Sequence, residues 1–463
     1  MVHLYIYIMC QTRIMFNVIK ASRTLGRCIT FRAVDSKIKY FGNQALLKRL
    51  YSGNNVVSNE KSDLYRQLYA KILACGPITL AEYMKEVLIH PTIGYYMTKD
   101  VFGQKGDFIT SPEISQLFGE IIAIWMINEW RKINDEPIQL VELGPGRGTL
   151  INDILRVFKK FNLLDKVSVH LVEISPALSQ LQTERLCTES RDNEPTGNED
   201  EKSTMYYREG VTKNGVKIYW YYSINDIPKK FSIFVAHEFF DALPIHKFQK
   251  TDKGWREILV DIVQETSEER FRYVLSQIAT PACKVYLSPN EKRDHVEVSP
   301  QSFVITDYMS QFLWECGGFA LVIDYGHERE KSDTFRAFRQ HKLHDPLLKP
   351  GTADLTADVD FLSIKEIAQK DDRLIVFGPV TQKRFLRNLG IDLRLKMLLQ
   401  NATGTQKQQI ESGYHMITDE DKMGSCFKVL SLFPFILKDY LTKWPVAGFE
   451  DEVKPMDKSD LLK

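Results

Sequence analysis

At residues 141–149 the chain reads Val141-Glu142-Leu143-Gly144-Pro145-Gly146-Arg147-Gly148-Thr149. An apolar run precedes this segment and a helical pattern follows it, which is the context that a glycine-rich ligand loop requires. Glycines are needed where a ligand approaches the backbone closely, and the N-terminus of the following helix offers free N–H groups. The segment therefore predicts a strand, a ligand loop and a helix within an α/β sheet.

The spacing of these glycines indicates the kind of ligand. Gly144, Gly146 and Gly148 follow the pattern G-x-G-x-G, whereas dinucleotide-binding loops have G-x-G-x-x-G and P-loops continue with a lysine. Glu142 lies at the strand end, where a carboxylate can hold the ammonium group of a methionine and would repel a pyrophosphate. We therefore expect S-adenosylmethionine as the cofactor, bound by Glu142 and the three glycines.

The ends of the next two strands supply further cofactor contacts. The apolar run 167–172 is followed by Glu173, 25 residues after Gly148, where a carboxylate accepts hydrogen bonds from ribose hydroxyls. The alternative for Glu173 is a strand-end charge without a ligand, and the glycine loop upstream makes that the weaker interpretation. Asn225 lies in the turn after the third strand and is expected near the adenine.

Apolar runs alternate with helical patterns beyond residue 137. This alternation predicts a doubly wound α/β fold, in which helices cover both faces of a parallel sheet. The runs occupy residues 139–143, 167–172, 217–221, 231–236 and 320–323.

The same patterns divide the chain into regions. Residues 137–245 are expected to form the cofactor-binding core, with a polar, solvated insertion at 188–204. Two strand-like runs flank Thr251-Asp252-Lys253-Gly254 and predict a hairpin, so residues 246–300 are expected to form a β-rich insertion. Residues 301–445 complete the catalytic domain and 446–463 form a tail. Within 301–445 we expect a long polar connection after residue 330, a helix ending at Gly390, a helix over 392–399 and a closing strand over 426–432.

Residues 52–136 are expected to form an N-terminal helical region with a lid. Thr79-Leu80-Ala81-Glu82 has the pattern of a capping box, and Ser111-Pro112 predicts a helix start capped by the Ser111 hydroxyl. Apolar residues at helical period predict that the following helix packs on the sheet: Ile114, Leu117, Phe118, Ile121, Ile122 and Trp125. The loop 106–111 between the helices is a candidate lid.

The segment after the fourth strand carries candidate catalytic residues. It reads His237-Glu238-Phe239-Phe240-Asp241-Ala242-Leu243-Pro244. Ligands of open α/β sheets bind at the carboxyl ends of the strands, so Glu238 and Asp241 are expected to face the methyl donor, with His237 beside them. Two carboxylates suit a guanidinium, which they hold by bidentate bonds and orient in line with the methyl carbon. The alternative is that the two acids cap the next helix.

The N-terminal segment differs from the rest of the chain in charge. Residues 1–51 contain nine Lys or Arg and one acidic residue, Asp35, which is the composition of a mitochondrial transit peptide. Arg49-Leu50-Tyr51-Ser52 resembles a matrix processing site, so a mature start near Ser52 in the mitochondrial matrix is expected. A basic tail without a targeting role is the alternative.

Charge and composition exclude several classes of protein. Of the 61 basic and 60 acidic residues, 52 and 59 remain beyond residue 51, and a negative body argues against a nucleic-acid partner. The chain has no apolar run long enough to span a membrane. Its seven cysteines show no CxxC spacing and no neighbouring histidine cluster, so neither a metal nor a disulfide framework is expected.

Taken together, these motifs resemble the MidA-like arginine methyltransferases, whose eukaryotic members are mitochondrial complex I assembly factors. The resemblance covers nearly the whole chain after Ser52 and is strongest in three segments: 106–113, 142–148 and 238–244. Residues 324–327, 350–361 and 378–382 fit as well.

The resemblance implies a seven-stranded class I methyltransferase sheet and symmetric dimethylation of an arginine on a matrix-arm core subunit of complex I. It also implies that Asp107 and Thr110 belong to the cofactor pocket. Asp354, Asp358 and Asp360 are implied to line the acceptor cleft. His237 departs from the asparagine of bacterial members, so the role of this position is open.

Two other functions compete with this one. An assembly chaperone could keep a methyltransferase fold without catalysis, although an intact glycine loop has no use in a pure scaffold. A nicotinamide-dependent oxidoreductase is disfavoured by the glycine spacing. The sequence leaves open whether the protein forms a homodimer.

Overall fold

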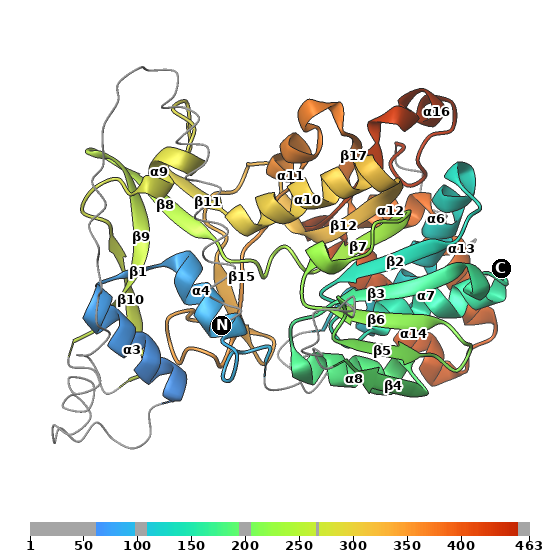
Figure 1. The fold of residues 1–463 in the computed structure, drawn as a ribbon, viewed down its shortest axis with the longest axis horizontal. Helices are drawn as coiled ribbons and strands as arrows, with labels where there is room; N and C mark the ends of the chain where they lie inside the picture. Colours follow the sequence, from blue (N-terminus) through green and yellow to red (C-terminus); the bar gives the residue numbers. More distant parts are fainter. Residues whose placement is uncertain (1–61, 98–108, 194–204, 265–267, 452–463) are drawn as a thin grey trace, which may run out of the picture. The chain divides into compact units, whose positions relative to one another are not determined.

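The computed structural model describes residues 62–97, 109–193, 205–264 and 268–451 (Figure 1). Several predicted features lie outside the described residues. These are the leader 1–51, lid residues 106–108 with the candidate pocket residue Asp107, residues 194–204 of the polar insertion and residues 452–463 of the tail.

A large central sheet has its strands in the order β17-β18-β12-β7-β2-β3-β6-β5-β4. Neighbours from β12 to β6 pair in parallel, whereas β18 runs antiparallel to both β12 and β17. The five predicted strands are therefore present and parallel. The seven strands that make up this part of the sheet are β2 (Ile138–Leu143), β3 (Val167–Val172), β6 (Lys217–Tyr221), β7 (Ser232–His237), β12 (Gly318–His327), β17 (Leu374–Thr381) and β18 (Phe427–Pro434).

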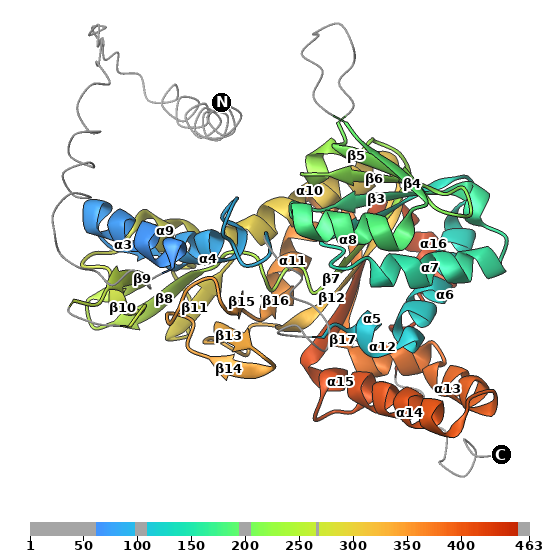
Figure 2. The same ribbon diagram turned by 90° about the horizontal axis from the view of Figure 1, so that it is seen from below.

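Helices cover both faces of this sheet, which confirms the doubly wound fold (Figures 1 and 2). Successive residues of β2 point to opposite faces, so Leu140 joins one hydrophobic core and Val141 joins another. The first core includes α6 (Gln116–Ile133) and α7 (Thr149–Lys160), and the second includes α10 (Pro300–Cys316) and α11 (Phe361–Ala368). Helix α8 (Pro176–Leu186) follows β3.

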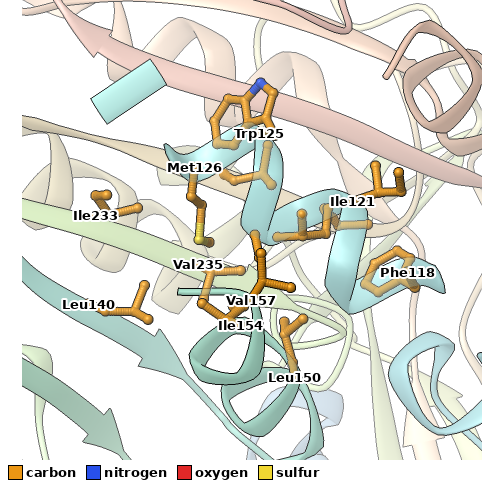
Figure 3. Close-up of a cluster of buried hydrophobic side chains, with 14 of the residues drawn as sticks. Phe118, Ile121, Trp125, Met126, Leu140, Leu150, Ile154, Val157, Ile233 and Val235 are labelled. Atoms are coloured by element: carbon orange, nitrogen blue, oxygen red, sulfur yellow. The ribbon is translucent and has the colours of Figure 1, made fainter. Parts of the chain in front are cut away.

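The predicted apolar stripe of α6 packs on the sheet as expected. Figure 3 shows Phe118, Ile121 and Trp125 in one cluster with Leu140 and Val235 of the strands. The start of this helix differs from the prediction. Ser111 is the first residue of a separate short helix, α5 (Ser111–Ile114), whose N-cap is Thr110.

The prediction that the Ser111 hydroxyl caps a helix is wrong. Its oxygen is buried and accepts no hydrogen bond from the described residues. The actual cap of α6 is Ser115, whose extended backbone separates the two helices and whose hydroxyl accepts a hydrogen bond from the Leu117 N–H. The motif Ser-Pro marks a helix start, but the second hydroxyl four residues later competes for the same role.

One end of the central sheet is extended by two strands, β4 (Glu189–Asp192) and β5 (Arg208–Val211). Residues 188–204 were expected to form a solvated insertion, and the four residues of β4 are indeed exposed. No apolar pattern marks β4, because an edge strand with both faces in water needs only backbone partners.

A second sheet contains the predicted hairpin. Strands β8 (His246–Thr251) and β9 (Gly254–Ile262) pair around Asp252 and Lys253, and β10 (Phe271–Leu275) and β11 (His295–Val298) flank them. Strand β1 (Ile78–Thr79) from the N-terminal region also pairs with β9.

Three helices, α3 (Asp63–Cys75), α4 (Leu80–Ile89) and α9 (Pro281–Tyr286), accompany this second sheet. The Thr79 hydroxyl caps α4 by accepting a hydrogen bond from the Glu82 N–H, as predicted. Side chains of α3, α4, β9 and β15 share one hydrophobic core, so the N-terminal helices and the β-rich insertion are packed together.

The predicted long polar connection after residue 330 is wrong. Strands β13 (Arg336–Arg339), β14 (Lys342–His344) and β15 (Asp354–Thr356) form a small sheet, and β16 (Val359–Asp360) pairs with β12. Their few apolar side chains, such as Ala337 and Leu355, are buried in the core of α3 and α4. That burial depends on residues more than 200 positions away, so local hydropathy did not predict it.

The C-terminal part is mainly helical. Helices α12 (Gln382–Asn388) and α13 (Ile391–Gln400) match the two that were predicted, and β18 is the predicted closing strand. Three further helices follow or intervene: α14 (Gly404–Thr418), α15 (Met423–Cys426) and α16 (Lys438–Lys443). Helix α14 was not expected, although Thr403 and Gln406 form a capping box at its start. Within the described ranges, no helix has the length and hydropathy needed to cross a membrane.

Replacing Trp125 by alanine is expected to lower the free energy of unfolding by about 3–5 kcal/mol. Trp125 contacts Phe319 and Phe433 edge-on, and its indole N–H donates a hydrogen bond to the Ala447 carbonyl at 2.9 Å. Urea unfolding measures the change. The matched control is Trp314→Ala, because Trp314 is 58% exposed and its loss should change stability by less than about 0.5 kcal/mol.

Candidate active site

A cavity of about 390 Å³ lies at the carboxyl ends of β2, β3, β6 and β7. This volume is within the usual range for a small-molecule site, and parallel strands are expected to present ligands at this edge. The cavity is lined at one end by Gly144, Gly146, Glu173, Tyr222 and Asn225, and at the other by Tyr96, Glu238, Asp241, Tyr325, Phe338, Asp354 and Thr356.

Gly144 and Gly146 of the glycine loop line the first end of the cavity. Gly144 and Gly146 both have positive φ, +63° and +51°, which disfavours any residue with a side chain. A Cβ atom at Gly144 would also lie 2.8 Å from the Phe239 ring. The loop therefore requires glycine for two reasons: its backbone has positive φ, and Phe239, in the turn that follows β7, packs closely against Gly144.

Glu173 lines the cavity, as predicted, and its orientation is fixed by neighbours. Its Oε1 accepts a hydrogen bond from the Ser175 N–H at 2.7 Å, and its Oε2 accepts one from Gln182 Nε2 at 3.1 Å. Gln182 Nε2 also donates to the Gly146 carbonyl, at 2.7 Å, so one amide links the glycine loop to Glu173. Burial raises the pKa of Glu173 to about 7.

Glu142 is buried and does not line the cavity directly. Its Oε2 has no hydrogen-bond partner among the described residues. Burial, followed by the nearby charge of Glu173, raises the pKa of Glu142 to about 8. A buried carboxyl oxygen without a partner beside the glycine loop is chemically suited to a cationic group or a bridging water.

Asn225 also lines the cavity, in the turn after β6. It is exposed, and its side-chain amide donates a hydrogen bond to the Ser223 hydroxyl at 3.1 Å. Tyr308 of α10 donates to the Asn225 carbonyl and lines the same end of the cavity. Its place near the adenine stays a prediction, and Asp107 lies outside the described residues.

Glu238 is held in an uncommon backbone conformation at the end of β7. Its φ is +50°, its N–H donates to the Ile323 carbonyl, and its Oε1 accepts a hydrogen bond from the Ser111 N–H at 3.3 Å. Positive φ in a residue with a side chain costs energy and often occurs at functional sites. Burial and the charge of Asp241 raise the pKa of Glu238 well above its ordinary value.

Asp241 lies three residues further on and shares the cavity wall with Glu238. Its Oδ2 accepts a hydrogen bond from the Thr356 hydroxyl at 2.7 Å, while Oδ1 is buried without a partner among the described residues. Burial raises the pKa of Asp241. No helix begins directly after these two acids, since β8 follows, so the alternative of helix capping is excluded.

Asp324 fixes the turn that carries both acids. Its Oδ2 accepts hydrogen bonds from three backbone N–H groups, those of Phe239, Phe240 and Asp241, at 2.9–3.3 Å. Its Oδ1 accepts one from the Tyr325 N–H. Burial and the neighbouring acids raise the pKa of Asp324, whereas the hydrogen bonds from the turn oppose the shift.

His237 is not placed on the cavity wall. Its ring is buried against Phe118 and Phe427, with centroids 5.0 and 6.3 Å away. Burial lowers the pKa of His237 to about 3, so its Nε2, 3.3 Å from Glu238 Oε1, belongs to a neutral ring and forms no ion pair with the carboxylate. Nε2 also has no hydrogen-bond partner among the described residues. His237 can position Glu238 but does not itself face the reacting groups.

Of the three aspartates implied by the resemblance, only Asp354 lines the cavity. Its Oδ1 accepts a hydrogen bond from the Tyr96 hydroxyl at 2.6 Å. Asp358 instead pairs with Lys331 and Arg336, and Asp360 caps α11 and pairs with Arg329. Both line a different cavity, in which they form these ion pairs. Their implied place in the acceptor cleft stays a prediction.

Several site residues were not predicted: Tyr96, Gln182, Asp324, Tyr325 and Thr356. Asp324 had a sequence signal, because it follows the apolar run 320–323 and thus occupies a strand end next to β7. Tyr325 is the next residue of the same strand, β12. The other three lack such a signal, because Tyr96 follows α4, Gln182 lies on α8 and Thr356 lies on β15 of the small sheet. Among the described residues, no cluster of His, Cys, Asp or Glu is arranged to hold a metal.

Comparison with known proteins agrees with this geometry. A family model described as a putative S-adenosyl-L-methionine-dependent methyltransferase matches residues 121–380. The chain is 49% identical over 392 residues to the human mitochondrial protein arginine methyltransferase NDUFAF7, covering 84% of this chain and 87% of the relative. It is 48% identical over 390 residues to the Drosophila melanogaster homologue, also named mitochondrial, covering 83% and 88%.

The chain belongs to the NDUFAF7 family of protein arginine methyltransferases. Among solved structures, a Burkholderia thailandensis protein with bound S-adenosyl-homocysteine is similar at a TM-score of 0.63 and 23% identity. The match covers 81% of this chain and 92% of that one, and it shows that the fold is shared. The sequence resemblance and the predicted fold are therefore confirmed.

The cofactor of this NDUFAF7-family protein is S-adenosylmethionine. The residues present fit it, because Gly144, Gly146 and Glu173 line the cavity and Glu142, two residues before Gly144, has an unpartnered oxygen among the described residues. Gly144 and Gly146 would lie against the methionine part, Glu173 would accept from the ribose and Asn225 would lie near the adenine.

Glu173→Ala is expected to weaken S-adenosylmethionine binding at least about tenfold, which corresponds to about 1.4 kcal/mol. The substitution removes the ribose acceptor and leaves the Gln182 amide without one of its acceptors. Isothermal titration calorimetry measures the dissociation constant. Glu184→Ala, on the exposed side of α8, is the matched control. An unchanged dissociation constant for Glu173→Ala would contradict the assigned contact.

Stability without cofactor is expected to fall by about 2 kcal/mol between pH 6.5 and 8.5. The raised pKa values of Glu142, about 8, and Glu173, about 7, mean that the folded state keeps protons that the unfolded state has lost. This stabilisation is complete below pH 4.5 and disappears as pH rises through the folded pKa values. His170 and His237 titrate oppositely, with pKa values lowered to about 3, but only below this window.

Urea unfolding at several pH values tests this dependence, with Glu142→Gln as the comparison. The variant cannot ionise, so its stability should decline less than that of the wild type as pH rises. Parallel declines in the two proteins would show that Glu142 is not the titrating group.

Proposed function

We propose that this protein transfers the methyl group of S-adenosylmethionine to an arginine side chain of a protein. One observation carries the proposal. Glu238 and Asp241 line the cavity that continues from the glycine loop, and within the described residues neither forms an ion pair with a lysine or arginine. The charge of Arg336 acts on Asp241, but Arg336 forms its ion pair with Asp358. Buried acids without an ion pair are costly, and a guanidinium acceptor would supply one.

The two acids can orient the acceptor as well as bind it. S-adenosylmethionine, when bound, supplies a methyl group on a sulfonium, which is a good leaving group. Glu238 and Asp241 would hold the guanidinium through charge-assisted hydrogen bonds and aim one nitrogen at the methyl carbon. The acceptor nitrogen would then bond to the methyl carbon, and the sulfur would leave as a neutral thioether. The proton released from the nitrogen then passes to one of the carboxylates, whose raised pKa makes it a better base.

Other residues would act by fixing these acids. Thr356 donates to Asp241, the Ser111 N–H donates to Glu238, and His237 lies 3.3 Å from Glu238. We assign these three groups positioning roles, because only Thr356 among them lines the cavity and its hydroxyl already donates to Asp241. A preorganised pair of acids does not need to rearrange as the reaction proceeds, which lowers the barrier.

We further propose a substrate and a compartment. The acceptor is a core subunit of the matrix arm of complex I, the product is symmetric dimethylarginine and the protein acts in the mitochondrial matrix. The names of the human and fly relatives support mitochondrial location and arginine methylation. The basic composition of residues 1–51 supports import. The resemblance to complex I assembly factors supports the substrate and the symmetric product.

A two-step experiment tests the proposed function. Purified residues 52–463 are titrated with S-adenosylmethionine, then incubated with recombinant matrix-arm core subunits, and methylated arginines are identified by mass spectrometry. Transfer to arginine with a symmetric product supports the proposal. Cofactor binding without transfer to any arginine would instead favour a chaperone that keeps the methyltransferase fold.

Glu238→Gln and Asp241→Asn are each expected to lower kcat by about 100-fold or more while changing cofactor affinity by less than about threefold. Each variant keeps the shape of the side chain but removes the charge that holds the guanidinium. Steady-state methyl transfer and calorimetry provide the two readouts. Glu315→Gln, at an exposed acid of α10, is the control. Normal turnover in Glu238→Gln would remove Glu238 from the mechanism.

A further inference from the structure

A second, wider hollow of about 1210 Å³ adjoins the active-site cavity. Three residues line both hollows: Ile109, Tyr325 and Phe338. The two hollows therefore meet at these three residues. Tyr325 follows Asp324, whose carboxylate accepts a hydrogen bond from the Asp241 N–H, so this meeting point is on the side of the cavity where Glu238 and Asp241 lie. Its remaining lining includes residues of α5, the glycine loop, the β13–β14 hairpin and α14, whose positions can be followed in Figure 2.

One wall of this groove is a stripe of exposed side chains on α14. Thr405, Gln408, Gln409, Ser412 and Met416 recur at the three- and four-residue spacing of one helix face, and all are exposed. The opposite face of the helix is buried through Tyr414 and Ile417. The helix is thus anchored by one side and offers amide and hydroxyl groups along the other.

The opposite wall of the groove comes from the small sheet. Phe338 and the exposed His341 lie at the β13–β14 hairpin, and Tyr325 lies at the junction with the cavity. The Arg336 guanidinium carbon is 5.6 Å from the Tyr325 ring centre and 5.7 Å from that of Phe338. These two rings already contact one guanidinium, so aromatic faces of the kind that stack on arginine are present at the junction.

The two ends of the active-site cavity have different chemistry. The end formed by Glu173, Tyr222 and Asn225 is the cofactor end, where the nucleoside would lie. Tyr325 and Phe338 line both the acidic end and the groove. An acceptor that must reach Glu238 and Asp241 while the cofactor is bound therefore approaches from the groove.

From this arrangement we propose that the groove between α14 and the β13–β14 hairpin binds an extended segment of the acceptor polypeptide. The acceptor arginine then passes between Tyr325 and Phe338 to reach Glu238 and Asp241. This inference rests on the proposed arginine methyltransferase activity and specifies how its substrate binds. The amides of Gln408 and Gln409 and the hydroxyl of Ser412 suit the exposed N–H and C=O groups of an extended chain.

The charge of the groove further defines the occupant. Glu113 and Arg147 on its floor form an ion pair at 3.2 Å, and the α14 stripe is uncharged. Arg185 is a further charged lining residue; it is exposed and donates a hydrogen bond to the Thr149 hydroxyl. Recognition would therefore depend mainly on the backbone of the acceptor and on its arginine, with Arg185 able to meet an acidic residue beside it. Such a surface fits a loop or unfolded segment and does not fit free arginine.

Ser412→Trp tests the proposal by filling the groove at the centre of the α14 stripe. The probes are recombinant complex I matrix-arm core subunits and N-acetyl-arginine amide, each assayed with radiolabelled S-adenosylmethionine. The KM for the protein acceptor should rise about tenfold or more, with kcat changed less than about threefold and cofactor affinity unchanged. Transfer to the small amide, at whatever rate the wild type shows, should be unaffected because it does not occupy the groove.

Two further variants keep the test decisive. Gln408→Ala with Gln409→Ala should raise the same KM without adding bulk, and Lys407→Trp is the matched control because exposed Lys407 does not line the groove. An unchanged KM in Ser412→Trp and in the double variant would overturn the proposal. The proposal would also be overturned if the KM for the protein acceptor rose in Val304→Trp but in neither groove variant. Val304 is 67% exposed and lines the active-site cavity on its α10 side, away from the groove. If the wild type transfers no methyl group to arginine, the proposed function itself fails, which is a different result.

Discussion

The carboxylate of Asp324 accepts hydrogen bonds from the N–H groups of Phe239, Phe240 and Asp241, and this contact fixes the relation between the two ends of the active site. Consecutive N–H groups can point at one oxygen only if the backbone curls tightly, which places Glu238 at positive φ. The same curl brings Phe239 against Gly144. The donor loop and the acceptor acids are therefore held by one turn, supported by a neighbouring strand.

The acceptor side depends on parts of the chain that lie outside the central sheet. Thr356 and Asp354 come from β15, and Tyr96 follows α4. Their positions are maintained by a hydrophobic core that joins α3, α4, β9 and β15. The Ser175 hydroxyl, at the start of α8, donates to the Tyr96 carbonyl at 2.6 Å, which ties that core to the cofactor-binding part. Segments outside the central sheet thus supply residues that the sheet itself lacks.

The site contains several buried acids, which are unfavourable for the stability of the folded protein. Glu142, Glu173, Glu238, Asp241 and Asp324 all have raised pKa values, with burial as the largest cause. Buried acids destabilise the folded protein unless they are protonated or paired. A cationic cofactor and a cationic acceptor would both relieve that destabilisation. The buried acids reduce the stability of the free protein, and the same acids favour the binding of a cationic cofactor and acceptor.

Local patterns in the sequence determined the elements of the central sheet and the cofactor loop. Alternating apolar runs predicted five parallel strands, and the glycine spacing with Glu173 predicted the cofactor end, because both depend on residues close together in the chain. The acids Glu238 and Asp241 were predicted from a general property of such sheets, which present ligands at the carboxyl ends of their strands.

Only the tertiary structure decided which distant residues complete the site. Asp354 joins the cavity while Asp358 and Asp360 form ion pairs elsewhere, although all three belong to one acidic stretch. Thr356 meets Asp241 across 115 positions of sequence, and α14 contributes a groove wall although its polar face shows no local sign of a site. Hydrogen bonding and burial across such separations depend on how the two hydrophobic cores pack, which no short stretch of sequence encodes.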